Sequence, residues 1–148
     1  MMPITNIIDV IYPVPKDIAE RLFNEKVKVF LKFLAHNPAK LAPKNRVIIY
    51  ASHGSGKLIG EGIIDKVEFL TPEEAIIKYK KELFLTKNEI YNYIRKSFSR
   101  SPSKEVLTLT LKGLRKYRKP IQYPKPIIIA GQYLSFSEYN SSMQKEEE

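Results

Sequence analysis

A first segment carries side chains that could bind the base and the phosphate of a nucleotide. At positions 26–32, Phe30 stands between Lys28 and Lys32 at alternate positions. If this segment is a β-strand, the three side chains share one face, where the ring would stack on a base and the ammonium groups would bind phosphates. The alternative is that Phe30 belongs to the core and that the lysines extend around a second buried face. The residues alone leave both interpretations open.

Hydrogen-bonding groups follow in the next segment. Arg46, Tyr50 and Ser52 alternate along a second expected strand, so they share a face. The phenol and the hydroxyl could both hydrogen-bond to a base edge. Tyr50 fits equally well as a core tyrosine with its hydroxyl at the rim.

A third segment places Glu61 between Gly60 and Gly62 in an otherwise apolar run. Glycine inside a strand is unfavourable unless a bulge or the close approach of a ligand explains it. Glu61 could accept hydrogen bonds from a base, although pairing with a lysine is the commoner role. The preceding residues 53–56 are typical of a hairpin turn. Residues 54–57 do not have the glycine spacing of a phosphate-binding loop, but Lys57 could still contact phosphate.

Catalysis finds less support than binding. The chain has no cysteine, and its two histidines, His36 and His53, lie outside any metal-ligand pattern. We therefore expect no metal site and no cofactor. The enzymatic alternative is an acid–base pair of Lys28 or Lys32 with Glu61, acting on a nucleoside or a small amide, and it requires a strongly shifted lysine pKa.

The charge pattern favours a polyanionic partner. The 148 residues carry a formal net charge of +9, and the basic residues fall in two blocks: seven without any acidic residue at 26–57, and ten against Glu105 alone at 92–127. Clustered lysine and arginine bind phosphate backbones by releasing counterions, so RNA or another polyanion is the expected partner. A merely lysine-rich surface, as in thermophiles, is the alternative. A third interpretation is a protein-interaction module within a ribonucleoprotein, and the oligomeric state stays undetermined.

Alternation and capping predict an α+β domain. We expect a helix at 17–24 and strands at 26–34, 47–52, 58–70 and 106–112. Capping boxes at Thr71 and Thr86 predict two helices between the strands. Residues 120–126 are too rich in proline for a central strand, so they form an edge strand or a connector, before a short buried strand at 126–130 and a helix from Ser135. This order predicts five or more strands in a small, curved, mostly antiparallel sheet or pseudobarrel with peripheral helices.

The runs 47–52 and 58–64, with the hairpin between them, resemble the PUA-like superfamily, which includes PUA, ASCH, EVE and YTH domains. The chain looks like an uncharacterised archaeal family within that group. Further similarity lies at 29–32, at 83–86 with Glu89 and Tyr93, and at 130–134. The resemblance implies a pseudobarrel that recognises RNA or a modified nucleobase. Residues 24–32 do not match the ASCH pattern Gly-x-Lys-x-x-Glu-x-Arg, and the chain has no tryptophan for a YTH-type cage.

The resemblance also places Tyr133 at the wall of a pocket. We therefore predict a site that is lined by Lys32, Tyr50, Ser52, Glu61 and Tyr133, with Gly60, Gly62 and Gly131 allowing close backbone approach.

One domain over residues 1–142 and a disordered acidic tail at 143–148 account for the length. With no basic leader and no apolar stretch of about 20 residues, the chain is expected to be cytoplasmic and free of the membrane.

Overall fold

The computed structural model of the protein describes residues 9–24, 27–33, 41–52, 56–96, 104–124, 127 and 131–147. Over these residues the chain forms six strands, four α-helices and one 3₁₀ turn. In chain order they are β1 (Asp9–Pro15), α1 (Lys16–Asn24), β2 (Val29–Lys32), β3 (Arg46–Ser52), β4 (Lys57–Leu70), α2 (Pro72–Tyr79), η1 (Lys80–Glu82), α3 (Lys87–Arg95), β5 (Val106–Gln122), β6 (Gln132–Leu134) and α4 (Phe136–Glu147).

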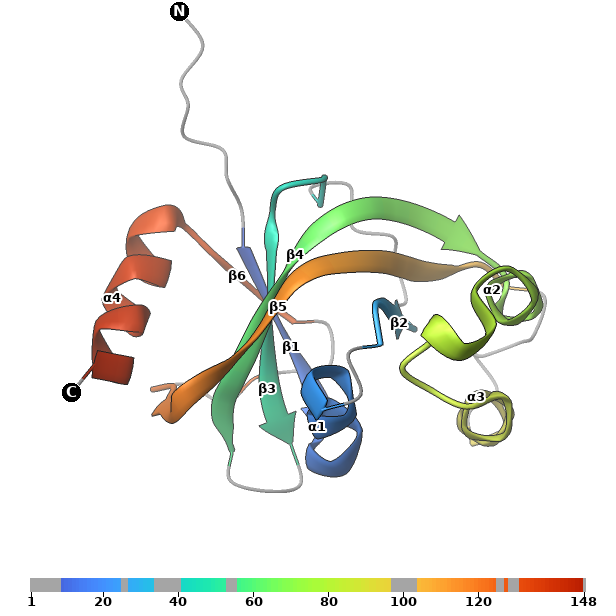
Figure 1. Ribbon diagram of the computed structural model, residues 1–148, viewed down its shortest axis with the longest axis horizontal. Coiled ribbons are helices and arrows are strands. Elements are labelled where there is room, and N and C mark those ends of the chain that lie inside the picture. Colours follow the sequence, from blue (N-terminus) through green and yellow to red (C-terminus); the bar gives the residue numbers. More distant parts are fainter. Residues whose placement is uncertain are drawn as a thin grey trace, which may run out of the picture.

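The described strands form a single mixed sheet in the order β2-β5-β4-β3-β1-β6. β1 and β3 are parallel, and the other pairs are antiparallel. The sheet curves into a half-barrel, with α1, α2 and α3 on one side of the twisted strands and α4 on the other (Figure 1). The expected α+β pseudobarrel is therefore confirmed.

Two long strands, β4 and β5, produce the curvature. Their pairing shifts register at three places, including one between Leu58 and Gly60 and one between Glu61 and Ile63. Each such irregularity bends the strand and increases its twist. β2 pairs with β5 only up to Thr110, so within the described chain residues 112–122 pair with β4 alone. Pro120 is tolerated in this part of β5 because an edge strand need not donate every amide hydrogen.

The helices between the strands begin where their capping residues predict. Thr71 and Thr86 each accept a hydrogen bond from the backbone of a glutamate three residues later, and that glutamate bonds back to the threonine amide. Each box satisfies two amide groups that a helix N-terminus otherwise leaves unpaired. α2 and α3 thus follow β4 in the order expected.

β1 was not expected from the sequence. It carries Pro13 and Pro15, yet it lies inside the sheet, between β3 and β6. The residues that pair with β6 are 9–11, which precede both prolines. The short buried strand expected at 126–130 falls almost entirely outside the described residues, as do 53–55 of the hairpin.

Apolar side chains pack on both faces of the sheet. On one face Val10, Tyr12, Val47 and Ile49 join α1 and the residues around α2 and α3 in a large core cluster. On the other face a smaller cluster includes the β-strand residues Ile11, Ile48, Leu58, Tyr117, Ile121 and Leu134 together with Tyr139 of α4.

One expectation is corrected at these clusters. α4 spans Phe136–Glu147, and its Met143 packs on the smaller cluster one turn after Tyr139. Thr108, which alternation placed outward, is completely buried, because β5 is covered on both faces there. Its hydroxyl donates to the Val106 carbonyl.

Candidate binding site

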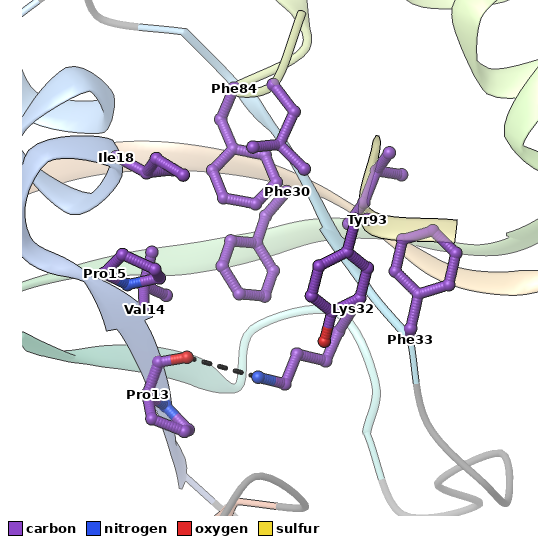
Figure 2. A pocket seen from close by; sticks show the side chains of 11 residues that line it. Pro13, Val14, Pro15, Ile18, Phe30, Lys32, Phe33, Phe84 and Tyr93 are labelled. Atoms are coloured by element: carbon purple, nitrogen blue, oxygen red, sulfur yellow. Dashed lines mark hydrogen bonds between the residues drawn. The ribbon is translucent and has the colours of Figure 1, made fainter. Parts of the chain in front are cut away.

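A pocket lies on the face of the sheet that carries α1 and α3 (Figure 2). Its volume is ≈ 120 Å³. An apolar cavity of about 150 Å³ holds a benzene ring, so the volume of this pocket is somewhat below that of a cavity which encloses one planar ring. Its walls come from the end of β1, the start of α1, β2, the segment after η1 and α3, and they include Pro13, Ile18, Phe30, Lys32, Phe84 and Tyr93.

Aromatic rings form the floor and one side of the pocket. Phe30 is completely buried; its ring lies 4.8 Å from that of Phe84 and 5.8 Å, nearly parallel, from that of Tyr12. Phe33 and Tyr93 pack against each other at 5.0 Å. Phe30 is thus a core residue that also lines the pocket, since its ring is held between two others.

Lys32 is the only charged residue among the described residues that line the pocket. Its ammonium group donates to the carbonyl of Pro13 at 3.2 Å and lies 5.4 Å from the centre of the Tyr12 ring. Burial, with a smaller contribution from nearby Tyr133, raises the pKa of Tyr12, so its phenol stays neutral. The pocket therefore combines apolar rings with one positive charge, a composition suited to a planar ligand that carries a negative group.

The sheet separates the residues that were predicted to line one pocket. Lys32 lies at the pocket. Tyr133 of β6 pairs with Val10 of β1, whose side chain belongs to the large cluster, so Tyr133 lies on the same face of the sheet as the pocket. Tyr133 does not line the pocket, and it is 37% exposed. Tyr50 packs on the opposite face with the smaller cluster, and Ser52, two residues further along β3, shares that face.

Glu61 lies beneath α4 in a buried polar network. Its Oε1 accepts hydrogen bonds from the hydroxyls of Tyr139 (2.7 Å) and Tyr117 (2.9 Å), and Arg115 Nη2 is 3.4 Å away. Burial, and to a lesser degree the Glu61 carboxylate, raises the pKa of Tyr139 to about 12. The same two causes raise the pKa of Tyr117. Both tyrosines therefore remain hydrogen-bond donors to Glu61.

Arg46 joins this network to β1. Its guanidinium lies 3.8 Å from the centre of the Tyr139 ring, 3.3 Å from Asp9 and 4.0 Å from Glu61. Asp9 is completely buried, and this burial raises its pKa although Arg46 acts in the opposite direction. The expected pairing of Glu61 with a lysine is thus replaced by arginines and tyrosines. Glu61 and Lys32 lie on opposite faces of the sheet, so these two residues do not meet.

The glycines make room for side chains of the protein itself. A Cβ on Gly60 would lie 2.4 Å from the Phe23 ring, and one on Gly62 would lie 2.9 Å from Leu114. Gly131, at φ +91°, would place its Cβ 2.7 Å from the Tyr12 ring. The expected close approaches exist, but their partners are core residues.

The other predicted residues lie apart from the pocket. Lys28 is exposed just before β2, and Lys57 is half-buried at the start of β4. His36 and His53 lie outside the described residues. No group of three or more potential metal ligands occurs in the described part of the chain. Of the helices in that part, none has the length and apolar character to cross a membrane.

The sequence missed several residues of the pocket. Pro13 and the supporting Tyr12 lie on the unexpected strand β1, and Phe33 was not proposed for binding. Tyr93 was part of the family resemblance but was not proposed for binding. The pattern that could have found it is its position one turn after Glu89 on the apolar side of a capped helix.

Comparisons with known proteins agree with this architecture. A family model described as "Domain of unknown function (DUF365)" matches residues 7–136. An uncharacterized protein of Methanocaldococcus jannaschii, MJECS03, is 33% identical over 106 residues, which cover 68% of this chain and 98% of that protein.

The solved structures that are similar share the fold at low sequence identity. The ASCH protein of Zymomonas mobilis superposes with a TM-score of 0.74 at 16% identity, covering 92% of this chain and 94% of that one. The N-terminal domain of Staphylothermus marinus McrB gives a TM-score of 0.50 at 17% identity, covering 82% and 78%. The expected PUA-like fold related to ASCH domains is confirmed, and the protein belongs to the family described as Domain of unknown function (DUF365).

Proposed function

We propose that this protein binds single-stranded RNA and holds one unpaired base in the pocket on the α1–α3 face. The observation that carries the proposal is the pocket itself: a small cavity with aromatic walls, in which Lys32 is the one charged lining residue of the described part of the chain. Unpaired bases are typically stacked on aromatic side chains, while basic groups bind the adjacent phosphates.

In this arrangement Tyr93 and Phe33 provide the stacking surface, because they form the aromatic side of the pocket above the buried Phe30. Lys32 neutralises a phosphate next to the bound base. Tyr12 contributes from below by holding the ammonium group over its ring. Tyr133 lies on the same face of the sheet and is 37% exposed, and we place it beside a neighbouring nucleotide.

The charge distribution supports a polyanionic ligand. Exposed basic residues lie along residues 112–119 of β5, and besides Arg115 of the Glu61 network they are Lys112, Lys116, Arg118 and Lys119. Such groups attract any phosphate backbone without reading its sequence. They account for general affinity, whereas the pocket accounts for the preference for an unpaired base.

Binding to a randomised single-stranded RNA of about ten nucleotides tests the proposal, since single-strand sites span about 4–16 nucleotides. Tyr93→Ala should weaken binding by about tenfold, because a stacked base contributes on the order of 1–3 kcal/mol. Lys32→Met should also weaken binding, because it removes the positive charge that neutralises the adjacent phosphate. Lys81→Met, at an exposed lysine of η1, is the control with the same change of charge.

Fluorescence anisotropy at low and moderate salt measures the affinities, and circular dichroism confirms folding. If folded Lys32→Met binds as Lys81→Met does, the pocket is not the site. If the wild-type protein binds no RNA even at low salt, the proposed function is wrong.

A further inference from the structure

Two helices that form opposite walls of the pocket are joined by one ion pair. Ile18 of α1 and Tyr93 of α3 both line the pocket. Between these helices the Arg21 guanidinium meets the Glu89 carboxylate in a two-pronged contact, with Nη1–Oε1 at 2.6 Å and Nη2–Oε2 at 3.0 Å. The partners are 68 residues apart in sequence. The pair therefore fixes the relative position of two walls that the chain itself does not hold together.

Each partner is one helical turn from a pocket residue. Arg21 follows Ile18 by three positions and Glu89 precedes Tyr93 by four, and such residues share a helix face. Arg21 Nη1 also donates to the carbonyl of Phe84 at 2.9 Å, and Phe84 lines the pocket between the two helices. Three parts of the pocket wall thus converge on one guanidinium.

Glu89 is itself held rigidly. Its Oε1 accepts the Thr86 amide at 2.8 Å, as the reciprocal half of the capping box that begins α3. The hydrogen bonds from Arg21 lower the pKa of Glu89 to about 2, so the carboxylate is ionised across the physiological range. Movement of α1 relative to the start of α3 therefore separates a permanent charge pair.

We propose that Arg21 and Glu89 are positioning residues that hold the pocket at the width needed to enclose a base. This inference rests on the proposed function. Neither residue contacts the ligand; both act through Ile18, Phe84 and Tyr93. Loss of either partner lets α1 and α3 separate, so the base is enclosed less tightly and leaves faster.

Two simpler roles predict different results. If the charges only attract or repel RNA, removing the negative charge of Glu89 strengthens binding and removing the positive charge of Arg21 weakens it. If the pair only stabilises the fold, both variants lose stability and bind normally per folded molecule. Positioning alone predicts that both variants weaken binding per folded molecule.

The experiment uses the randomised RNA of about ten nucleotides, with one base replaced by fluorescent 2-aminopurine, whose emission is quenched by stacking. The variants are Glu89→Gln, which retains a residue suited to the capping box, and Arg21→Gln. Glu74→Gln at the equivalent capping position of α2, and Arg95→Gln at the end of α3, are charge-matched controls. Folding is monitored by circular dichroism, and Arg21→Lys replaces Arg21→Gln if the latter unfolds.

We expect Glu89→Gln and Arg21→Gln each to bind RNA about three- to tenfold more weakly. This fold-change corresponds to the loss of about 1 kcal/mol, which is typical of a partly exposed ion pair. The quenching at saturation should fall, and the double variant should be no weaker than the worse single variant. Wild-type affinity and quenching in both variants, or tighter binding by Glu89→Gln, would overturn the inference. Absence of wild-type binding would instead remove the proposed function and this inference with it.

Discussion

The two faces of the sheet use similar side chains for different purposes. On the pocket face Tyr12 and Phe30 pack beside a lysine and leave a cavity between α1 and α3. On the α4 face Tyr117 and Tyr139 donate to Glu61, and arginines complete the network. A buried polar network whose members satisfy one another fixes the packing of the elements it joins. The comparison teaches that similar tyrosines and charged residues line a pocket on one face and satisfy one another's hydrogen bonds on the other.

The largest effect should come from removing Glu61. Glu61→Ala leaves two buried tyrosine hydroxyls and the neighbouring arginines without their shared acceptor, so stability should fall by about 3 kcal/mol. RNA affinity per folded molecule should be unchanged, because Glu61 and the pocket lie on opposite faces. Urea denaturation and anisotropy measure the two quantities. Glu61→Gln, which keeps an acceptor oxygen, should lose less. Weaker RNA binding by a stable Glu61→Ala protein would contradict the division between the faces.

Gly60→Ala should have the next largest effect. The new Cβ would lie 2.4 Å from the Phe23 ring and 2.7 Å from the Arg115 carbonyl oxygen. Overpacking of this kind costs about 2 kcal/mol. Phe23→Leu should restore part of the loss in the double variant, as thermal unfolding would show. Should Gly60→Ala instead keep its stability and lose RNA binding, the glycine serves a ligand after all.

Tyr139→Phe should have a smaller effect. It removes one of the two phenolic hydrogen bonds to Glu61 and leaves the ring under Arg46, so about 1 kcal/mol of stability should be lost. Tyr117→Phe is the counterpart on β5, and coupling between the two substitutions would show that both hydroxyls act on one carboxylate. Strict additivity of the two losses would argue against a shared network.

The smallest expected effect is the loss of folding stability that Glu89 causes at low pH. Because the pKa of Glu89 is lowered from its ordinary 4.5 to about 2, the unfolded chain binds a proton more readily. The stability it contributes is complete above about pH 4.5 and is lost as the pH falls toward 2. Glu89→Gln should flatten this loss in denaturation curves recorded across that window. If the stability of Glu89→Gln fell with pH as steeply as that of the wild type, the Arg21–Glu89 ion pair would add no stability.

Asp9 provides the opposite case on the other face. Its pKa is raised above the ordinary 3.8, so its contribution is present at lower pH and is lost as the pH rises through its folded pKa. Asp9→Asn should remove the loss of stability that accompanies rising pH. The slope of the unfolding free energy against pH should therefore change in the direction opposite to that expected for Glu89→Gln.

Local patterns predicted much of the fold, and long-range packing decided the site. The helices after Thr71 and Thr86 were predictable because a capping box involves only four consecutive residues. Lys32 and Glu61 were expected in one pocket, but their faces depend on the bulges of β4 and on a strand order that alternation does not encode. β1 was missed because Pro13 and Pro15 are residues that strands usually exclude, and Tyr12 was missed with it.

The position of β1 also bears on how the chain folds. β1 pairs with β6 from the opposite end of the described chain, and Tyr139 reaches Glu61 across 78 residues of sequence. Contacts between such distant segments form slowly, because the entropy of closing a long loop must be overcome first. During synthesis the edge of β1 therefore stays open until residues 132–134 emerge, and an open edge can recruit a strand of another chain. Beyond Ile11 no described strand covers this edge, and there Pro13 and Pro15 lack the amide hydrogens that an intruding strand would need. Because proline has no amide hydrogen to donate, Pro13 and Pro15 should make this stretch of β1 a poorer template for a strand of another chain.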